Sequence, residues 1–518
     1  MKRLLLISCL AFTSCVDFDA KYRACVDAGR CTDDAGILPD AGDDAGLTDA
    51  GADAGPQDAG DVDAGLDAGT QDAGFDAGAP FDPGTWLEIS PIMDGGGRFG
   101  APTPFGPDIT TSATSLSVAY RQFGEVPPGE TPRHFAVRRF DGGTWALDTA
   151  ASNRMDALAA AQGVPFPPMR SFDSPFDRAL IAETDLGMFF APDSYSGGGN
   201  RITNNHFAMT GTNVVLDFAH TGSALAARGN QAWVAMRRCL EIPMRVEVVV
   251  SEASASNVVS LALGNVGTFS TCIDLQNTLA FDLRVGAPTI TVNPTNGLRF
   301  VAFAAQVTDG GVVTDIDGGM NPRVELQMHA ALTSNNSWTR LDSASTLTAD
   351  QLPIESVVAL SPAGASGALL AFEDRAPQPG PRQRVRSWRV ASGSFTDPGN
   401  AAGTNLVAVK SLNSMTERYV WDRVNSLATL EVAGRSWVLL SVLAGIDGDE
   451  IFLVSIGPNE SQWRTHTNPL TGSGQINDPS CEISRARLSS WQNAPVVTWA
   501  QRCFGGPRTD LVVMWLRP

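Results

Sequence analysis

The chain has 518 residues, of which 43% are hydrophobic and 18% charged, and its net charge is −19. This length and composition predict a folded protein with one large core or two ordinary ones. Acidity of this size disfavours a nucleic-acid partner, because phosphate backbones select positively charged surfaces.

The N-terminus reads "MKRLLLISCLAFTSC". Lys2 and Arg3 precede a short apolar run, 4–12, that is too short to span a bilayer. This pattern resembles a bacterial lipoprotein signal, which implies removal of residues 1–14 and acylation of Cys15. We therefore expect an exported protein held in the lipid bilayer by its N-terminus, in the periplasm or on the cell surface of a bacterium. The alternative is an ordinary secretory signal cut near the same place.

Six further cysteines form three pairs that are close in sequence, as expected for disulfides in an exported chain. The pairs are Cys25 with Cys31, Cys239 with Cys272, and Cys481 with Cys503. The chain contains no Cys-x-x-Cys, and its five histidines are scattered. A zinc motif is therefore missing from the sequence, and we expect no metal and no cofactor.

An acidic repeat dominates residues 15–79. Residues 27–78 contain eleven Asp-Ala-Gly triplets, with fourteen aspartates against one arginine. So little apolar surface predicts a disordered, low-complexity linker. Calcium binding is the alternative, but the residues between the triplets vary, whereas a calcium-bound β-roll needs regular apolar positions. The repeat resembles the stalks of uncharacterised bacterial lipoproteins, which implies a spacer between membrane and domain.

Residues 80–518 contain short apolar strands separated by Gly, Pro, Asn and Asp, and the best helix candidate is 156–162. One apolar phrase recurs and is typical of a strand buried on both faces. Its copies are "SLSVAY" (115–120), "QAWVAM" (231–236), "LRFVAF" (298–303), "GALLAF" (367–372), "RSWVLLSV" (435–442) and "APVVTWA" (494–500), with a weaker copy, "RALIAET", at 178–184.

Each copy stands second in a predicted four-stranded unit, and successive units start roughly 45–70 residues apart, a spacing typical of a β-propeller. Separate β-sandwiches would need linkers that the sequence lacks. "FDPGTW" (81–86) repeats the spacing of "FDGGTW" (140–145), which leads into a fourth strand. We therefore predict an all-β, seven-bladed propeller whose last blade, ending at 518, is closed by the strand after the linker.

The last two cysteines fit this prediction. Residues 480–488 and 494–503 should form a hairpin around Gln492, which makes Cys481 and Cys503 cross-strand neighbours. A disulfide closing such a loop contributes about 3 kcal/mol. Cys239 and Cys272 should staple the same face of the ring.

We expect the ligand face to be the one where second strands end. The main candidates are Arg121, Arg237, Arg238, Glu373, Asp374, Arg375 and Arg502. Further candidates are Asp447, Asp449 and Glu450, with Asp478 and Glu355 at the starts of first strands. Arginines around a funnel suit carboxylates or acidic sugars, although polar loops carry charged residues by default.

Two functions remain open. The first is a monomeric, membrane-tethered binding module for a protein or glycan of the envelope or the extracellular space. The second is an extracellular carbohydrate-active enzyme, such as a sialidase-like one, because "FDGGTW" resembles the sialidase turn but lacks one residue and the leading serine. Candidate nucleophiles are Tyr419, near Glu417, and Tyr120, beside Arg121. Since no catalytic motif is complete, the binding module is our main prediction, and the catalytic residues stay unassigned.

Overall fold

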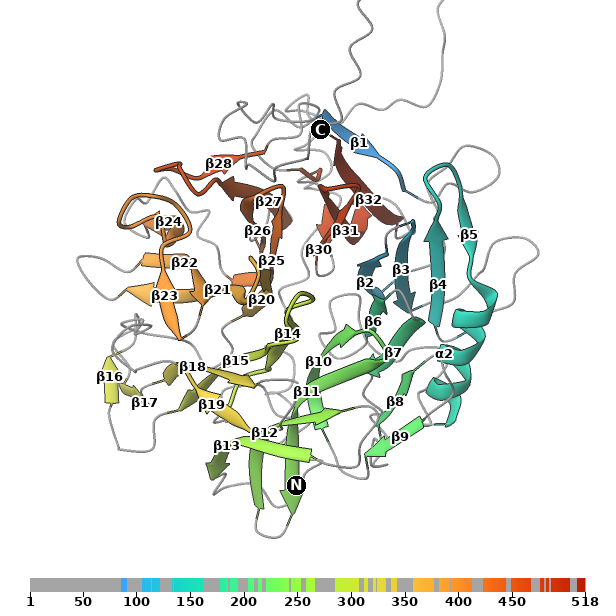
Figure 1. Ribbon diagram of the computed structural model, residues 1–518, viewed down its shortest axis with the longest axis horizontal. Helices are drawn as coiled ribbons and strands as arrows, with labels where there is room; N and C mark the ends of the chain where they lie inside the picture. The colour runs from blue at the N-terminus through green and yellow to red at the C-terminus, as the bar shows by residue number, and fades with distance from the viewer. Residues whose placement is uncertain are drawn as a thin grey trace, which may run out of the picture. The chain divides into compact units, whose positions relative to one another are not determined.

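The computed structural model describes residues 85–517 with internal gaps, the longest of which are 91–104, 162–177, 266–284 and 342–356. The chain divides into two units, Met1–Ala79 and Pro80–Pro518, and every described residue belongs to the second. The described strands of this unit form seven sheets of four or five strands and one separate two-stranded hairpin. The sheets follow one another around a ring (Figure 1), and the all-β propeller is therefore confirmed.

We number the sheets in chain order, and in sheets 1 to 6 the first strand lies at the inner edge (Figure 1). Sheet 1 contains β2 (Phe105–Thr111), β3 (Leu116–Arg121), β4 (Phe135–Phe140) and β5 (Trp145–Leu147). Sheet 2 contains β6 (Arg178–Thr184), β7 (Gly187–Asp193), β8 (Asn204–Ala208) and β9 (Asn213–Leu216). Sheet 3 contains β10 (His220–Arg228), β11 (Gln231–Glu241), β12 (Met244–Glu252) and β13 (Val258–Asn265).

Sheets 4 to 6 follow the same order. Sheet 4 contains β14 (Thr289–Val292), β15 (Arg299–Gln306), β18 (Val324–Ala331) and β19 (Trp338–Arg340), with the hairpin of β16 (Val312–Thr314) and β17 (Met320–Pro322) inserted. Sheet 5 contains β20 (Val358–Ala363), β21 (Gly367–Ala376), β22 (Arg382–Ala391), β23 (Ser394–Thr396) and β24 (Leu406–Ser411). Sheet 6 contains β25 (Arg423–Val432), β26 (Arg435–Leu443), β27 (Asp449–Ile456) and β28 (Arg464–Thr465).

Sheet 7 joins the two ends of the domain. It contains β29 (Cys481–Ile483), β30 (Arg487–Trp491), β31 (Ala494–Cys503), β32 (Asp510–Arg517) and the early strand β1 (Thr85–Glu88). β1 pairs antiparallel with β32, and just beyond it the Val513 amide donates to Ser90 Oγ at 3.0 Å. The predicted closure of the ring by the first strand after the linker is confirmed.

The core lies between neighbouring sheets. Every strand position of β3 is buried, and its residues alternate between the two neighbours: Val118 and Tyr120 pack with Leu511 of sheet 7, whereas Ala119 packs with Ile181 of sheet 2. Comparable apolar clusters join each other pair of adjacent sheets. The recurring apolar phrase therefore marks strands buried on both faces, as predicted.

Side chains from neighbouring sheets satisfy backbone groups on the inner edges of first strands. Asp108 accepts a hydrogen bond from the Ile181 amide at 3.0 Å, and Thr110 accepts one from the Glu183 amide at 2.8 Å. Asn293 donates to carbonyl groups of the β20–β21 turn, including that of Gly367 at 3.0 Å. Unpaired strand edges are costly and prone to aggregation, and the Asp108 and Thr110 contacts satisfy part of the inner edge of β6.

Two sequence predictions need correction. Residues 178–184 were predicted as a second strand, but they form β6, the first strand of sheet 2, and β7 stands second. The helix expected at 156–162 is longer: α2 spans Thr149–Ala161 and starts where Asp148 accepts a hydrogen bond from the Ala151 amide at 2.9 Å. This cap satisfies an amide at the start of the helix, and Ser152 fixes α2 to β4 through the Val137 amide.

Candidate functional site

The candidate ligand face is the one where the second strands end and their links to the third strands begin. Arg121, Arg237 and Glu373 occupy matching places toward this end, each following the aligned residues Tyr120, Met236 or Phe372 of the repeated phrase, although β11 and β21 continue beyond Arg237 and Glu373, to Glu241 and Ala376. All three side chains are buried. The Arg121 guanidinium carbon lies 5.9 Å from the centroid of the Phe135 ring, close enough for a cation–π contact. Three sheets therefore carry a buried charge at the same level of the ring.

The other predicted ligand-face residues are placed less completely. Arg238 lies in β11, and Asp374 and Arg375 lie in β21, but their side chains fall outside the described residues. Asp447 and Glu355 fall outside them altogether, while Asp449 and Glu450 begin β27. Asp478 is exposed and lies close to the start of β29.

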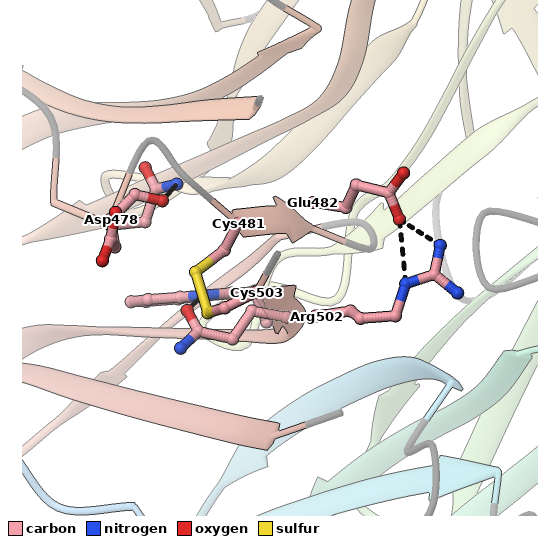
Figure 2. Close-up of a disulfide and its surroundings, with 8 residues drawn as sticks. Asp478, Cys481, Glu482, Arg502 and Cys503 are labelled. Atoms are coloured by element: carbon pink, nitrogen blue, oxygen red, sulfur yellow. Dashed lines mark hydrogen bonds and ion pairs between the residues drawn. A yellow bond between two sulfur atoms is a disulfide. The ribbon is translucent and has the colours of Figure 1, made fainter. Parts of the chain in front are cut away.

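A disulfide holds the ligand-face end of sheet 7. Cys481 and Cys503 are bonded and lie directly opposite each other in the register of β29 and β31, as predicted (Figure 2). The hairpin turn also lies where predicted, with Gln492 and Asn493 at φ values of 48° and 60°. These left-handed values fit a two-residue turn between twisted strands. The predicted partnerships of Cys25, Cys31, Cys239 and Cys272 concern side chains outside the described residues.

Arg502 meets a carboxylate that was not predicted. Its neighbour across the strands is Glu482; Arg502 Nε donates to Glu482 Oε2 at 3.0 Å, and Nη2 donates to the same oxygen (Figure 2). Both side chains are nearly half exposed, at 46% and 44%. The Cys481–Cys503 register could have revealed this pair, because it places residue 482 opposite residue 502. Of the candidate arginines whose side chains the structure describes, Arg121 and Arg237 are buried and Arg502 is exposed.

The tyrosine candidates do not form a nucleophile in the described part of the chain. Tyr120 is fully buried, and its hydroxyl accepts a hydrogen bond from Arg138 Nε at 3.0 Å. Tyr419 and Glu417 lie outside the described residues. The sialidase-like turn is structural, because Asp141 accepts hydrogen bonds from the amides of Gly143 and Thr144. These bonds also lower the pKa of the Asp141 carboxyl.

A buried polar network in sheet 6 was not predicted. Arg435 forms a two-pronged ion pair with Glu460, with nitrogen–oxygen distances of 3.0 and 2.6 Å, and donates through Nε to Ser455 Oγ. Ser455 Oγ lies 2.7 Å from His466 Nε2. Burial, and next the positive charge of Arg435, lower the pKa of His466 from 6.5 to about 4. The serine and histidine are both buried, so this network stabilises the sheet and offers no nucleophile to a ligand.

The described segments between 85 and 517 bring together no group of three or more Asp, Glu, His or Cys side chains that could hold a metal ion. No helix in those segments is long and apolar enough to cross a membrane.

Several solved structures are similar to this chain over most of its length. The polysaccharide lyase Uly1 is 9% identical, covers 84% of this chain and 98% of its own, and gives a TM-score of 0.43. An ulvan lyase of family PL25, solved with -[GlcA(1-4)Rha3S]-, is 10% identical over 83% of this chain and 96% of its own, with a TM-score of 0.47. The Trypanosoma rangeli sialidase bound to the inhibitor DANA is 10% identical over 83% of this chain, with a TM-score of 0.36.

This chain spans 59% of the length of that sialidase. No protein-family model and no curated protein sequence matches the chain. At TM-scores below 0.5, the assignment of the fold rests on the strand pairing described above.

Proposed function

We propose that the protein is a carbohydrate-binding propeller that takes acidic sugars on the face where the second strands end. The observation that carries this proposal is Arg502, whose side chain is 46% exposed near the end of β31 and already binds a carboxylate, that of Glu482. Arg121, Arg237 and Glu373 lie at matching positions on other sheets, but they are buried. Guanidinium groups bind carboxylates in a planar, two-pronged geometry. In this proposal each of the seven sheets is one blade.

The proposal includes the place of the protein in the cell. We propose that Cys15 carries a lipid and that residues 15–79 hold the propeller away from the membrane as a monomer. Labelling of cells with a fatty-acid analogue tests the anchor: the natural protein should be labelled, and a Cys15→Ser variant should not. Equal labelling of both proteins would remove the lipid anchor from the proposal.

A glycan array tests the binding function. The purified full-length protein should retain oligosaccharides that carry carboxylates, and added salt should weaken their binding, because exposed charges are screened over about 8 Å at physiological ionic strength. Hydrogen exchange with bound ligand should then slow at the ends of β11, β21 and β31. Retention of neutral sugars alone, or protection confined to the turns that precede the second strands, would refute the proposed face.

Cleavage of the bound glycan is the second candidate. Its candidate groups are two buried carboxylates on separate sheets, Glu373 in β21 of sheet 5 and Glu247 in β12 of sheet 3, which are 3% and 1% exposed. New reducing ends after incubation with a retained oligosaccharide would indicate an enzyme. The variants Glu373→Gln and Glu247→Gln should then lose that activity. If both variants cleave as fast as the natural protein, these carboxylates are not the catalytic pair.

A further inference from the structure

The ion pair of Glu482 and Arg502 has an unusual geometry for an exposed pair. Two guanidinium nitrogens of Arg502, Nε and Nη2, donate to the single oxygen Oε2 of Glu482. A guanidinium binds a carboxylate best when each of two nitrogens has its own oxygen, because the two hydrogen bonds then run in parallel. The contact with Glu482 therefore uses one carboxylate oxygen where the best geometry uses two.

A disulfide next to the ion pair holds the backbones of Glu482 and Arg502 together. Glu482 follows Cys481 and Arg502 precedes Cys503, and these cysteines form the disulfide across β29 and β31. Figure 2 shows both side chains leaving the strands on the same side and meeting beyond them. The backbone positions of the arginine are therefore fixed before any ligand arrives, which lowers the entropy lost on binding.

The contact itself is easily replaced. Ion pairs between side chains as exposed as these contribute little to stability, because water and salt screen them. We propose that Glu482 is a built-in competitor that occupies Arg502 in the free protein, and that a sugar carboxylate displaces it and binds the guanidinium through both oxygens. This inference rests on the proposed function. It adds that Arg502 selects acidic sugars and that Glu482 competes with them for Arg502.

Glu88 provides a matched control. It is an exposed carboxylate of β1, at the opposite edge of sheet 7 from β29, and it is not a candidate for the ligand face. Replacing Glu88 by Gln removes one negative charge without touching Arg502. Replacing Glu482 by Gln removes the same charge together with the competitor.

Calorimetric titration of the full-length protein with an oligogalacturonide, and with a neutral oligosaccharide of equal length, tests the inference. We expect Glu482→Gln to bind the acidic sugar up to about fivefold more tightly, the upper limit of what an exposed ion pair represents. Glu88→Gln should leave the affinity unchanged, and Arg502→Gln should lower it at least about tenfold. Near-ultraviolet circular dichroism and the count of free thiols verify that each variant is folded.

The outcomes separate the two proposals. If the natural protein binds the acidic sugar and Glu482→Gln binds no more tightly than Glu88→Gln, the competitor role is refuted and the binding function stands. If Arg502→Gln binds as well as the natural protein, the arginine is not the carboxylate site. If neither the natural protein nor Glu482→Gln binds either sugar, the proposed function fails and this inference fails with it. Tighter binding of an acidic peptide than of the sugar would overturn the sugar as the ligand.

Discussion

The buried histidine of sheet 6 makes the stability of the ring depend on pH. His466 has a pKa of about 4 in the folded protein, against 6.5 when unperturbed, because burial and Arg435 oppose its charged form. Below pH 6.5 the unfolded chain binds a proton that the folded protein rejects until about pH 4. The free energy of unfolding therefore carries no penalty from His466 above pH 6.5, and it falls progressively between pH 6.5 and pH 4.

The size of this loss follows from the two pKa values. The difference between 6.5 and about 4 corresponds to about 3 kcal/mol of unfolding free energy, at 1.36 kcal/mol per pH unit. Urea unfolding followed by tryptophan fluorescence at pH 7, 6, 5 and 4 measures it. Glu460 contributes at lower pH: although burial opposes this, hydrogen bonds from Arg435 and Gly457 lower its pKa below 4.5, and its stabilisation is lost as the pH falls through that lowered pKa.

The matched variant is His466→Gln, which keeps a side-chain polar group near Ser455 but does not titrate. We expect this variant to be less stable than the natural protein at pH 7, because His466 also packs against Trp437 at a ring distance of 4.6 Å. Its stability should fall by about 3 kcal/mol less than that of the natural protein between pH 7 and pH 4. Parallel pH profiles for the two proteins would refute the reasoning.

Three further predictions concern the framework of the ring. Gly399→Ala would place a methyl group 2.4 Å from a backbone carbonyl oxygen of sheet 6, so we expect a loss of about 1–3 kcal/mol in urea unfolding, whereas Gly143→Ala, whose nearest atom lies at 3.8 Å, should cost far less. Replacing Cys481 and Cys503 by Ser should lower the unfolding free energy by about 3 kcal/mol; no change would mean that the strand pairing alone holds this edge. Deleting 510–518 removes the partner of β1 and should abolish cooperative unfolding of the whole ring, and a truncated protein of unchanged stability would contradict closure.

The sequence could predict the parts of the fold that depend on local spacing. The repeat of "FDPGTW" and "FDGGTW" was enough to identify β1 as a late partner in the ring, and the symmetry of Cys481 and Cys503 about Gln492 was enough to set a register. Sheet 2 was assigned wrongly, because β6 and β7 are similarly apolar and only their pairing decides which is innermost. Periodicity cannot distinguish two buried strands of this kind.

The candidate site was predicted in outline only. A charged residue at the end of a strand can be read from the sequence, but its burial depends on the neighbouring sheet, and Arg121 and Glu373 are buried for that reason. The network of Arg435 and His466 joins a residue of the second strand to the residue after the fourth strand through Ser455 of the third, and no local pattern connects them. Distant partners of this kind require the packed structure.

The strand that closes the ring is also the first described strand after the N-terminal part of the chain. A pull transmitted through that part would act along β1, while its hydrogen bonds to β32 run across the strands. Such a load shears all the bonds of the pair together and does not peel them apart one at a time. Trp86, buried between sheets 6 and 7, would have to leave the core in the same step. A force applied through the N-terminal part of the chain would therefore load the same strand pair, β1 and β32, that closes the ring.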